Sequence, residues 1–311
     1  MPDQATLLSP DLRRRRRFTL VTLGCTIVLL SWGAVVTSID AGLAVPDWPT
    51  SFDSYDPINP MPQWYAIPPV LAEHGHRLLG MLVGFCTIVL AGWTWYADPR
   101  RWMKYLGMIA LVLVIVQGTL GGFRVLWQSL NLAVIHACVA QLYFSLLAAM
   151  WVFTTPTWLN REGLAEGEAG DALRRYFWLP VSALYGQVVL GAVLRHVGQG
   201  VDVALAMIHM TGAFLVFGIL LMAIRWVRLS STRGTLVHHV SGVMAVLLVA
   251  QIGLGFVAYA VLLQEAGIGR SGLQVLLNTT HMVVGASLMA ATVMLTILGV
   301  RKPLPEQHLR E

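Results

Sequence analysis

The sequence predicts an all-α integral membrane protein in which eight transmembrane helices form two repeated four-helix bundles. Of its 311 residues, 56% are hydrophobic and 12% are charged, whereas soluble domains carry roughly 25% charged residues. The mean hydropathy of +0.67 excludes a soluble globular enzyme, a disordered chain and a secreted disulfide scaffold. A membrane-spanning helix needs about 20 predominantly apolar residues. Eight such stretches are present, at 18–39, 71–96, 104–123, 131–153, 176–195, 203–224, 238–262 and 273–299.

The first stretch follows the basic run Arg13–Arg17. This run suits anionic lipid and membrane topology, so no nucleic acid is expected as a partner. The stretch 18–39 is longer than the apolar region of a signal peptide and no small-residue cleavage site follows it, which favours a retained anchor helix. The cysteines Cys25, Cys86 and Cys138 all fall inside apolar stretches, so they offer no disulfide framework.

Two polar segments set the predicted organisation. Segment 40–70 combines four aspartates with many prolines and aromatic residues, which predicts an ordered cap. The polar stretch Thr155–Ala172 divides the eight helices into four and four. The predicted parts are a cytoplasmic basic tail (1–17), an N-terminal bundle (18–153), a cytoplasmic linker (154–175), a C-terminal bundle (176–300) and a cytoplasmic tail (301–311).

The distribution of Lys and Arg predicts the orientation. Seventeen of the 21 lie on the side that carries both termini. Because cytoplasmic loops are rich in Lys and Arg, both termini are expected in the cytoplasm, with the protein in the cell (inner) membrane. The opposite side holds four arginines, which are Arg77, Arg124, Arg195 and Arg270.

A Gln-x-x-Leu-Gly pattern recurs on the third, fifth and seventh predicted helices, beginning at Gln117, Gln187 and Gln251. Each copy precedes an outer loop and then a helix that carries a histidine. This regular placement predicts that helices one to four and five to eight form related bundles with the same direction of traverse.

Four histidines share one expected depth. They lie on the even-numbered helices, about 8 to 12 Å below the outer boundary at 1.5 Å rise per residue. Ionisable groups inside a membrane are candidates for function because their burial is costly. Two imidazoles per bundle suit the axial ligation of haem iron better than zinc, which takes three or four ligands. Polar contacts between helices are the alternative. The four are His76, His136, His209 and His281.

Charged neighbours extend this site. A guanidinium suits a carboxylate, and haem carries propionates, so the four outer arginines are candidate propionate contacts; snorkelling to the interface is the alternative. Glu73 stands three residues before His76 and therefore on the same helical face. It could move protons or stabilise developing positive charge. A simple ion pair with Arg77 is the alternative.

Several motifs together resemble the haem A synthase family over essentially the whole eight-helix span. They are Glu73-His74-Gly75-His76-Arg77, the loop run from Gly42 to Pro49 with its Pro-Asp-Trp-Pro, Ile135-His136-Ala137, Ile208-His209-Met210-Thr211-Gly212 and Asn278-Thr279-Thr280-His281. The resemblance implies an oxidoreductase that oxidises the C8 methyl group of haem O to a formyl group. The product is haem A for terminal oxidases.

The resemblance also implies residue roles. His76 and His136 would ligate the substrate haem O, with Glu73 as the catalytic acid beside the methyl group. His209 and His281 would ligate a permanent haem b. The chain departs from the family in the first outer loop, where many members have a cysteine pair and this sequence has Val45 and, further on, Thr50 and Ser51. An arginine common in relatives is replaced around Thr37 and Ser38.

Two other functions stay open at this stage. A di-haem b-type electron carrier would use paired histidines but typically places haems at both membrane faces. A haem-binding oxidase assembly factor would need the ligands without turnover. The expected partners are membrane lipid, a haem O synthase, a terminal oxidase in assembly and an unidentified electron donor. A homo-oligomer is left open.

Overall fold

The computed structural model describes residues 9–160, 168–265 and 271–300. Within these ranges, eight helices are long and apolar enough to cross a membrane. They are α1 (Pro10–Ser38), α2 (Pro68–Ala97), α3 (Arg101–Leu126), α4 (Leu130–Val152), α7 (Trp178–His196), α8 (Val203–Ser230), α9 (Leu236–Gln264) and α10 (Gly272–Val300). Each predicted stretch corresponds to one of them. The all-α, multi-pass fold class is therefore confirmed.

Local sequence explains where the helices begin. α1 starts eight residues before the predicted stretch because Ser9 caps it, its Oγ accepting a hydrogen bond from the Leu12 N–H at 3.1 Å, and Pro10 occupies the first turn. A proline there loses no hydrogen bond, since the first N–H groups of a helix have no partner within it. The basic run is consequently helical. Ser129, Asp202 and Thr235 cap α4, α8 and α9 in the same way.

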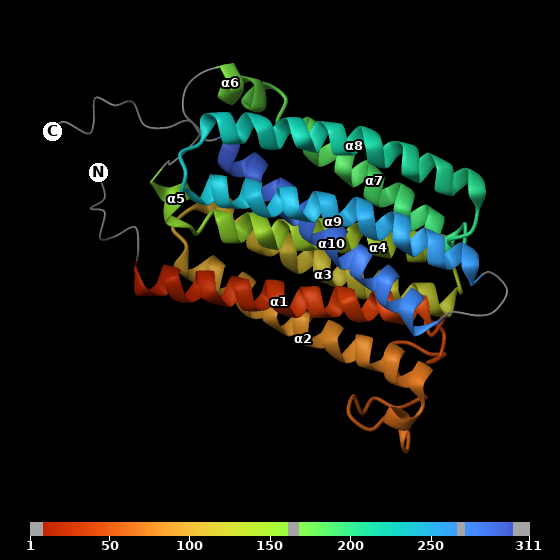
Figure 1. Cartoon of the computed structure of the whole chain (residues 1–311). Helices are drawn as coiled ribbons and strands as arrows, with labels where there is room; N and C mark the ends of the chain where they lie inside the picture. The colour runs from red at the N-terminus through yellow and green to blue at the C-terminus, as the bar shows by residue number, and fades with distance from the viewer. Residues whose placement is uncertain (1–8, 161–167, 266–270, 301–311) are drawn as a thin grey trace.

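The eight spans alternate in direction, so α1 begins and α10 ends at the same end of the molecule, here called the terminal end (Figure 1). Residues 39–67, with the short helix η2 (Trp64–Ala66), lie at the opposite loop end. Two further short helices, α5 (Pro156–Leu159) and α6 (Glu168–Arg175), fall within the predicted linker 154–175. The predicted division of the chain into domains stays a prediction.

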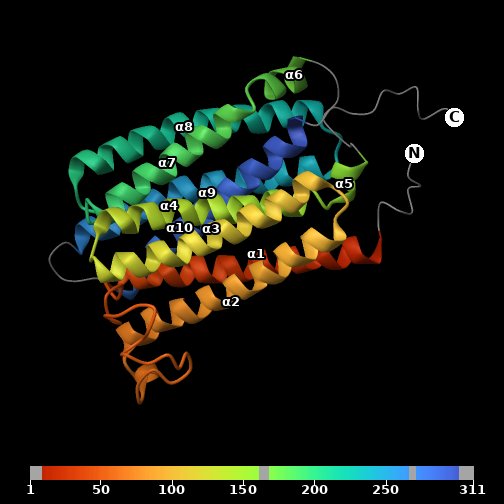
Figure 2. The ribbon, with the colours of Figure 1, turned by 180° about the vertical axis from the view of Figure 1, so that it is seen from behind.

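Helices α1 to α4 pack in sequence against one another, and α7 to α10 do the same. The two groups meet because α10 contacts α1 and α4 as well as α9, and α4 also contacts α7 (Figures 1 and 2). This arrangement agrees with two four-helix bundles joined along one side.

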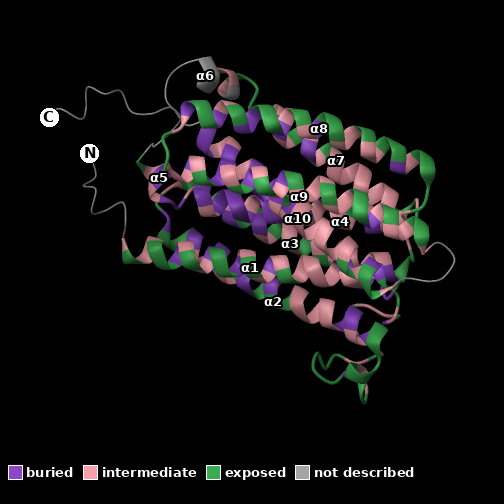
Figure 3. Cartoon of the chain, in the orientation of Figure 1, coloured by how far each residue is buried: buried purple, intermediate pink, exposed green. Residues whose placement is uncertain are grey.

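Buried apolar residues gather toward the terminal end (Figure 3). The largest cluster combines residues of α4, α7, α8, α9 and α10, among them Val152, Leu220, Met244 and Leu298. All of these lie in the halves of their helices nearest the terminal end. The loop-end halves, which carry the four candidate histidines, contain few buried residues.

Candidate functional site

The four candidate histidines lie within the first ten residues of α2, α4, α8 and α10, and all four helices begin at the loop end. All four side chains are partly buried. His76 lies within electrostatic range of His136, and His209 lies within electrostatic range of His281. The structure therefore brings the histidines together as predicted, one pair in each bundle.

The Gln-x-x-Leu-Gly motifs contact these histidines directly. His136 Nδ1 lies 3.1 Å from the Gln117 carbonyl oxygen, and the Gln117 side chain donates to the His136 carbonyl at 2.9 Å. Gln187 Nε2 lies 2.7 Å from the His209 carbonyl oxygen and 3.0 Å from His209 Nδ1. The motif thus ties each histidine to the helix before it.

The C-terminal pair repeats this contact on α9 and α10, where Gln251 Nε2 lies 3.2 Å from His281 Nε2. Among the described residues, no group of three or more His, Cys, Asp or Glu side chains is arranged to hold a metal ion.

Glu73 is buried one turn from His76 on α2. Its Oε1 accepts a hydrogen bond from Arg77 Nη2 at 3.0 Å, and its Oε2 accepts one from the Val45 N–H, also at 3.0 Å. The two contacts fix the position of both carboxylate oxygens. The ion pair of Glu73 with Arg77, which was the alternative interpretation of Glu73, is therefore present. It fixes the carboxylate one helical turn from His76.

Arg77 ties the outer loop to α2. Besides its bond to Glu73, its guanidinium donates to the carbonyl oxygens of Val45, Asp47 and Thr50 at 2.8 to 3.0 Å, and to Ser51 Oγ at 3.3 Å. A planar guanidinium with five donors is suited to several acceptors at once. Arg77 therefore organises the loop.

The loop is also ordered from within, as its composition predicted. The carboxylate of Asp47 accepts hydrogen bonds from the backbone N–H groups of Phe52 and Asp53 at 2.7 and 2.9 Å. Burial alone would raise the pKa of Asp47, but hydrogen bonds from Thr50, Asp53 and Phe52 hold this pKa below its ordinary value. An ionised Asp47 consequently stabilises the turn.

Arg124 joins the loop to α3. Its Nη2 donates to the Gly42 carbonyl at 3.2 Å, and its charge acts on Glu73, His76 and His136. Trp48 lies against Gly122 so closely that a Cβ there would collide with the indole ring. The loop therefore packs onto the N-terminal bundle beside its histidine pair, where the partly buried Arg124 joins it to α3.

Arg195, at the end of α7, crosses to the other bundle. Its Nη2 donates to the Ala34 carbonyl at 3.0 Å and to Ser38 Oγ at 2.6 Å, both on α1. It also lies within electrostatic range of His281. An arginine from the C-terminal bundle is thus placed at the position on α1 where the family resemblance expects one. Arg270, the fourth candidate propionate contact, lies outside the described residues.

His74 and His196 were missed by the sequence reasoning. The ring nitrogens of the buried His74 lie 3.2 Å from Ser51 Oγ and 3.0 Å from the Pro57 carbonyl, which fastens the loop to α2. Its place two residues before His76, on another helical face, could have indicated this role. His196, the last residue of α7, lies within electrostatic range of His136 and Arg124.

Fold and site together define a class of polytopic membrane protein with one imidazole pair in each of two related four-helix bundles. The chain belongs to the COX15-CtaA family of cytochrome oxidase assembly proteins, whose family model matches residues 16–206. The match ends before His209 and His281, so it covers the N-terminal histidine pair and not the C-terminal one.

Curated relatives are similar over part of their length. The chain is 28% identical over 188 residues to the haem A synthase of Alkalihalophilus pseudofirmus, which is 59% of this chain and 60% of that protein. It is 31% identical over 180 residues to that of Lysinibacillus sphaericus, covering 56% and 55%. Against that of Halalkalibacterium halodurans it is 33% identical over 140 residues, or 44% of each. The chain thus spans about half of the curated relatives it matches.

The residues present fit the haem that these relatives' name implies. The Nδ1–H of His136 can donate to the Gln117 carbonyl, which leaves the Nε2 lone pair for iron. His76 Nδ1 and His281 Nδ1 are buried without a hydrogen-bond partner. The charges of Arg124 and Arg195 lie near the two pairs, as acidic side groups of a porphyrin would require.

Proposed function

We propose that the chain is a haem A synthase that oxidises the C8 methyl group of haem O to a formyl group. In this proposal His76 and His136 ligate the substrate haem O in the N-terminal bundle. His209 and His281 are the axial ligands of a haem b in the C-terminal bundle. Family membership and the two imidazole pairs support both assignments. The bound haem b would supply one-electron redox chemistry.

The single observation that carries this proposal is the position of Glu73. It is buried one helical turn from His76 and held by Arg77 and the Val45 N–H. The C-terminal bundle has Ala206 at the equivalent place before His209. A carboxylate beside only one of two similar imidazole pairs gives the two pairs different chemistry.

The reaction defines what Glu73 does. With water as the oxygen source, conversion of the methyl group to a formyl group consumes one water and releases four protons and four electrons. The Glu73 carboxyl group would accept protons or stabilise positive charge as it develops on the methyl carbon. The electrons pass to an external acceptor. Arg124 and Arg195 are the proposed propionate contacts, and Arg77 acts mainly by fixing Glu73 and the loop.

Glu73→Gln tests this assignment. The variant should retain the haem b spectrum while haem A per mole of bound haem b falls about 10²- to 10⁴-fold, the usual effect of losing one acid–base group. Glu265→Gln is the matched control, because Glu265 is a loop-end carboxylate of the other bundle whose contacts are with Ser271. An unchanged ratio in Glu73→Gln would remove Glu73 from the mechanism, and bound haem b without haem A in the parent would favour an electron carrier.

We also propose that the protein lies in the cell membrane with both termini in the cytoplasm. The arginines of the terminal end, such as Arg100, Arg175 and Arg228, support this orientation. Reporter fusions near Ser54 and Gln199 should report the external side, and fusions near Glu166 the cytoplasm. The reverse pattern would contradict the proposal. Membrane lipid, a haem O synthase and a terminal oxidase in assembly are the proposed partners.

A further inference from the structure

Each of the four candidate histidines contacts a glycine of the preceding span. A Cβ added to any of these glycines would lie 2.8 to 3.2 Å from the Cε1 atom of the facing ring, closer than such atoms usually pack. In α1, Leu29 replaces the glutamine that stands four residues before the glycine in the other copies. The glycine contacts therefore place the two bundles in register, with α1, α2 and α4 corresponding to α7, α8 and α10. The pairs are Gly33 with His76, Gly121 with His136, Gly191 with His209, and Gly255 with His281.

Three hydroxyl groups, here called the hydroxyl layer, lie deeper in the N-terminal bundle than its histidine pair. Each stands close to two or three whole helical turns from a histidine or its glycine, and therefore on the same helical face. They are Tyr143, seven residues after His136, Thr87, eleven residues after His76, and Thr26, seven residues before Gly33. At 1.5 Å rise per residue, Tyr143 lies about 10 Å further than His136 from the loop end.

The members of the hydroxyl layer contact one another and are almost completely buried, with exposed fractions of 0 to 3%. The Tyr143 hydroxyl oxygen lies 2.5 Å from Thr87 Oγ1 and is also hydrogen-bonded to Thr26. Both threonine hydroxyls donate to carbonyl oxygens of their own helices, at 2.7 Å. Since a hydroxyl has one proton and two lone pairs, the Tyr143 O–H can serve only one of the two threonines. The three hydroxyl oxygens can therefore accept a hydrogen bond from one further donor.

The corresponding layer of the C-terminal bundle is apolar. Counted from the same glycine and histidines, all three positions are leucines, and all three are buried in the largest apolar cluster of the molecule. They are Leu184, seven residues before Gly191, Leu220, eleven residues after His209, and Leu288, seven residues after His281. Because leucines fill this layer in one bundle, helix packing does not require the hydroxyl groups in the other.

The two proposed haems differ in the same respect. Both carry propionates on one edge of the porphyrin. The opposite edge carries two vinyl groups in haem b, whereas in haem O a hydroxyethylfarnesyl group replaces one of them. If the propionates lie toward Arg124, at the loop end of α3, the opposite edge points toward the terminal end. The hydroxyl layer lies on that side of the N-terminal histidine pair.

We infer that Thr26, Thr87 and Tyr143 bind the hydroxyl group of the hydroxyethylfarnesyl side chain and so make the N-terminal bundle select haem O over haem b. The haem O hydroxyl supplies the further donor, which the oxygen of Tyr143 accepts. The three leucines of the other bundle suit the vinyl groups of haem b, which form no such hydrogen bond. The inference rests on the proposed function, from which it takes the two haems.

Haem titrations test this selection without requiring oxidation. The full chain, carrying its C-terminal haem b in detergent micelles, is titrated with haem O or with haem b, and absorbance gives each dissociation constant. His76→Ala should abolish the titrated binding and so identify the N-terminal site. Tyr143→Phe should weaken haem O binding about tenfold, the usual effect of leaving one buried hydroxyl without its partner. Binding of haem b at the same site should be unchanged.

Two related porphyrins separate the hydroxyl group from the farnesyl chain. Iron haematoporphyrin carries hydroxyethyl groups at the edge where iron mesoporphyrin carries ethyl groups, and neither has a farnesyl chain. Tyr143→Phe should lower the ratio of their affinities about tenfold. Tyr185→Phe is the matched control and should leave this ratio unchanged, because the Tyr185 hydroxyl contacts the Cys138 carbonyl instead, at 3.4 Å.

Two results with Tyr143→Phe would overturn the inference: unchanged binding of haem O, or equal weakening of haem O and haem b. The hydroxyl layer would then be a contact between helices alone. If Tyr143→Phe did not fold, Thr87→Val would take its place. A loss for haem O alone would support the inference, and equal losses or none would overturn it. Failure of the proposed function would be separate: the titrations would follow these expectations while no haem A formed.

Discussion

The two bundles share a helical plan but are stabilised differently. The N-terminal bundle has a buried ion pair at each end, Glu73 with Arg77 at the loop end and Asp98 with Arg15 at the terminal end. In the part of the C-terminal bundle that the structure describes, no buried ion pair occurs, and the largest apolar cluster of the molecule lies there. Its histidine rings contact glutamine side chains, whereas the His76 ring does not.

This difference indicates how one repeated scaffold can serve two purposes. Apolar packing and a hydrogen-bonded ring favour a single fixed arrangement, which suits a retained group. Buried charges with defined partners are costly unless every contact is kept. Of the two pairs, Glu73 with Arg77 lies at the loop end and therefore fixes the geometry beside the N-terminal histidine pair.

The strongest test of the comparison is deletion of the histidines. His209→Ala or His281→Ala should abolish the low-spin haem b spectrum, because each supplies one axial bond. His76→Ala should leave that spectrum intact, since His76 belongs to the other pair. Optical spectra of the purified variants decide this. If both C-terminal variants kept a normal six-coordinate spectrum, their assignment would be wrong.

Arg77→Gln should separate the loop from the N-terminal bundle. The change removes five hydrogen bonds to the loop and to Glu73. Because a carboxylate misplaced by about 1 Å can cost about 10²-fold in rate, haem A per haem b should fall by that order. Limited proteolysis within 40–66 should accelerate, while the haem b spectrum stays normal. A protected loop with low activity would instead indicate direct contact of Arg77 with the substrate.

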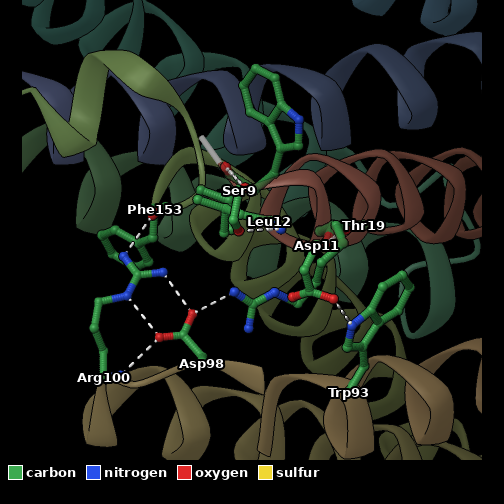
Figure 4. A network of polar contacts seen from close by, with 11 residues as sticks. Ser9, Asp11, Leu12, Thr19, Trp93, Asp98, Arg100 and Phe153 are labelled. Atoms are coloured by element: carbon green, nitrogen blue, oxygen red, sulfur yellow. Dashed lines mark hydrogen bonds and ion pairs between the residues drawn. The ribbon is translucent and has the colours of Figure 1, made fainter. Parts of the chain in front are cut away.

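Asp98→Asn should destabilise the terminal end. The buried Asp98 carboxylate accepts from Arg100 and pairs with Arg15 at 2.9 Å, and Arg100 continues to the Phe153 carbonyl (Figure 4). Breaking a buried pair costs about 3 to 5 kcal/mol in the free energy of unfolding, since the partner charge is left uncompensated.

The matched control is Asp171→Asn in the exposed pair with Arg174, which should change stability by about 1 kcal/mol or less. Thermal unfolding in detergent compares the two variants. Equal effects would contradict the distinction between a buried and an exposed ion pair.

The same carboxylate predicts a smaller effect of pH. Burial alone would raise the pKa of Asp98, but hydrogen bonds and charge from Arg100 and the charge of Arg15 lower it below its ordinary value of 3.8. A group with a depressed pKa in the folded state contributes its full stability above the ordinary value and loses it as pH falls through the folded-state pKa. Thermal stability should therefore decrease below about pH 4, and less so in Asp98→Asn.

Much of this fold could be predicted from the sequence because the membrane restricts the choices. Apolar stretches near 20 residues identify spans, and in α1 only the beginning was misplaced, since the cap at Ser9 extends the helix through the basic run. The places of His76 and His136 near the loop-end starts of α2 and α4 also follow from the apolar stretches, whereas their depth in the membrane stays a prediction. These are properties of single helices.

The contacts between helices could not be predicted in the same way. Three copies of the glutamine motif were visible, but the fourth was hidden because Leu29 replaces the glutamine and only Gly33 remains. The crossing of Arg195 to Ser38 joins residues 157 positions apart, and no periodicity encodes it. The sequence around a Gln or an Arg on a helix face does not indicate which neighbouring helix its side chain contacts.

The central position of α10 has a consequence for biogenesis. This helix packs against α1 and α4 of the first bundle as well as α7 and α9 of the second. Helices are synthesised in order from the N-terminus. Until α10 is inserted, the surfaces of α1 and α4 that it will contact therefore face lipid. The first bundle therefore completes its packing only when α10, the last of the described helices, has been inserted. Haem that bound either bundle before this step would bind a bundle that still lacks its contacts with α10.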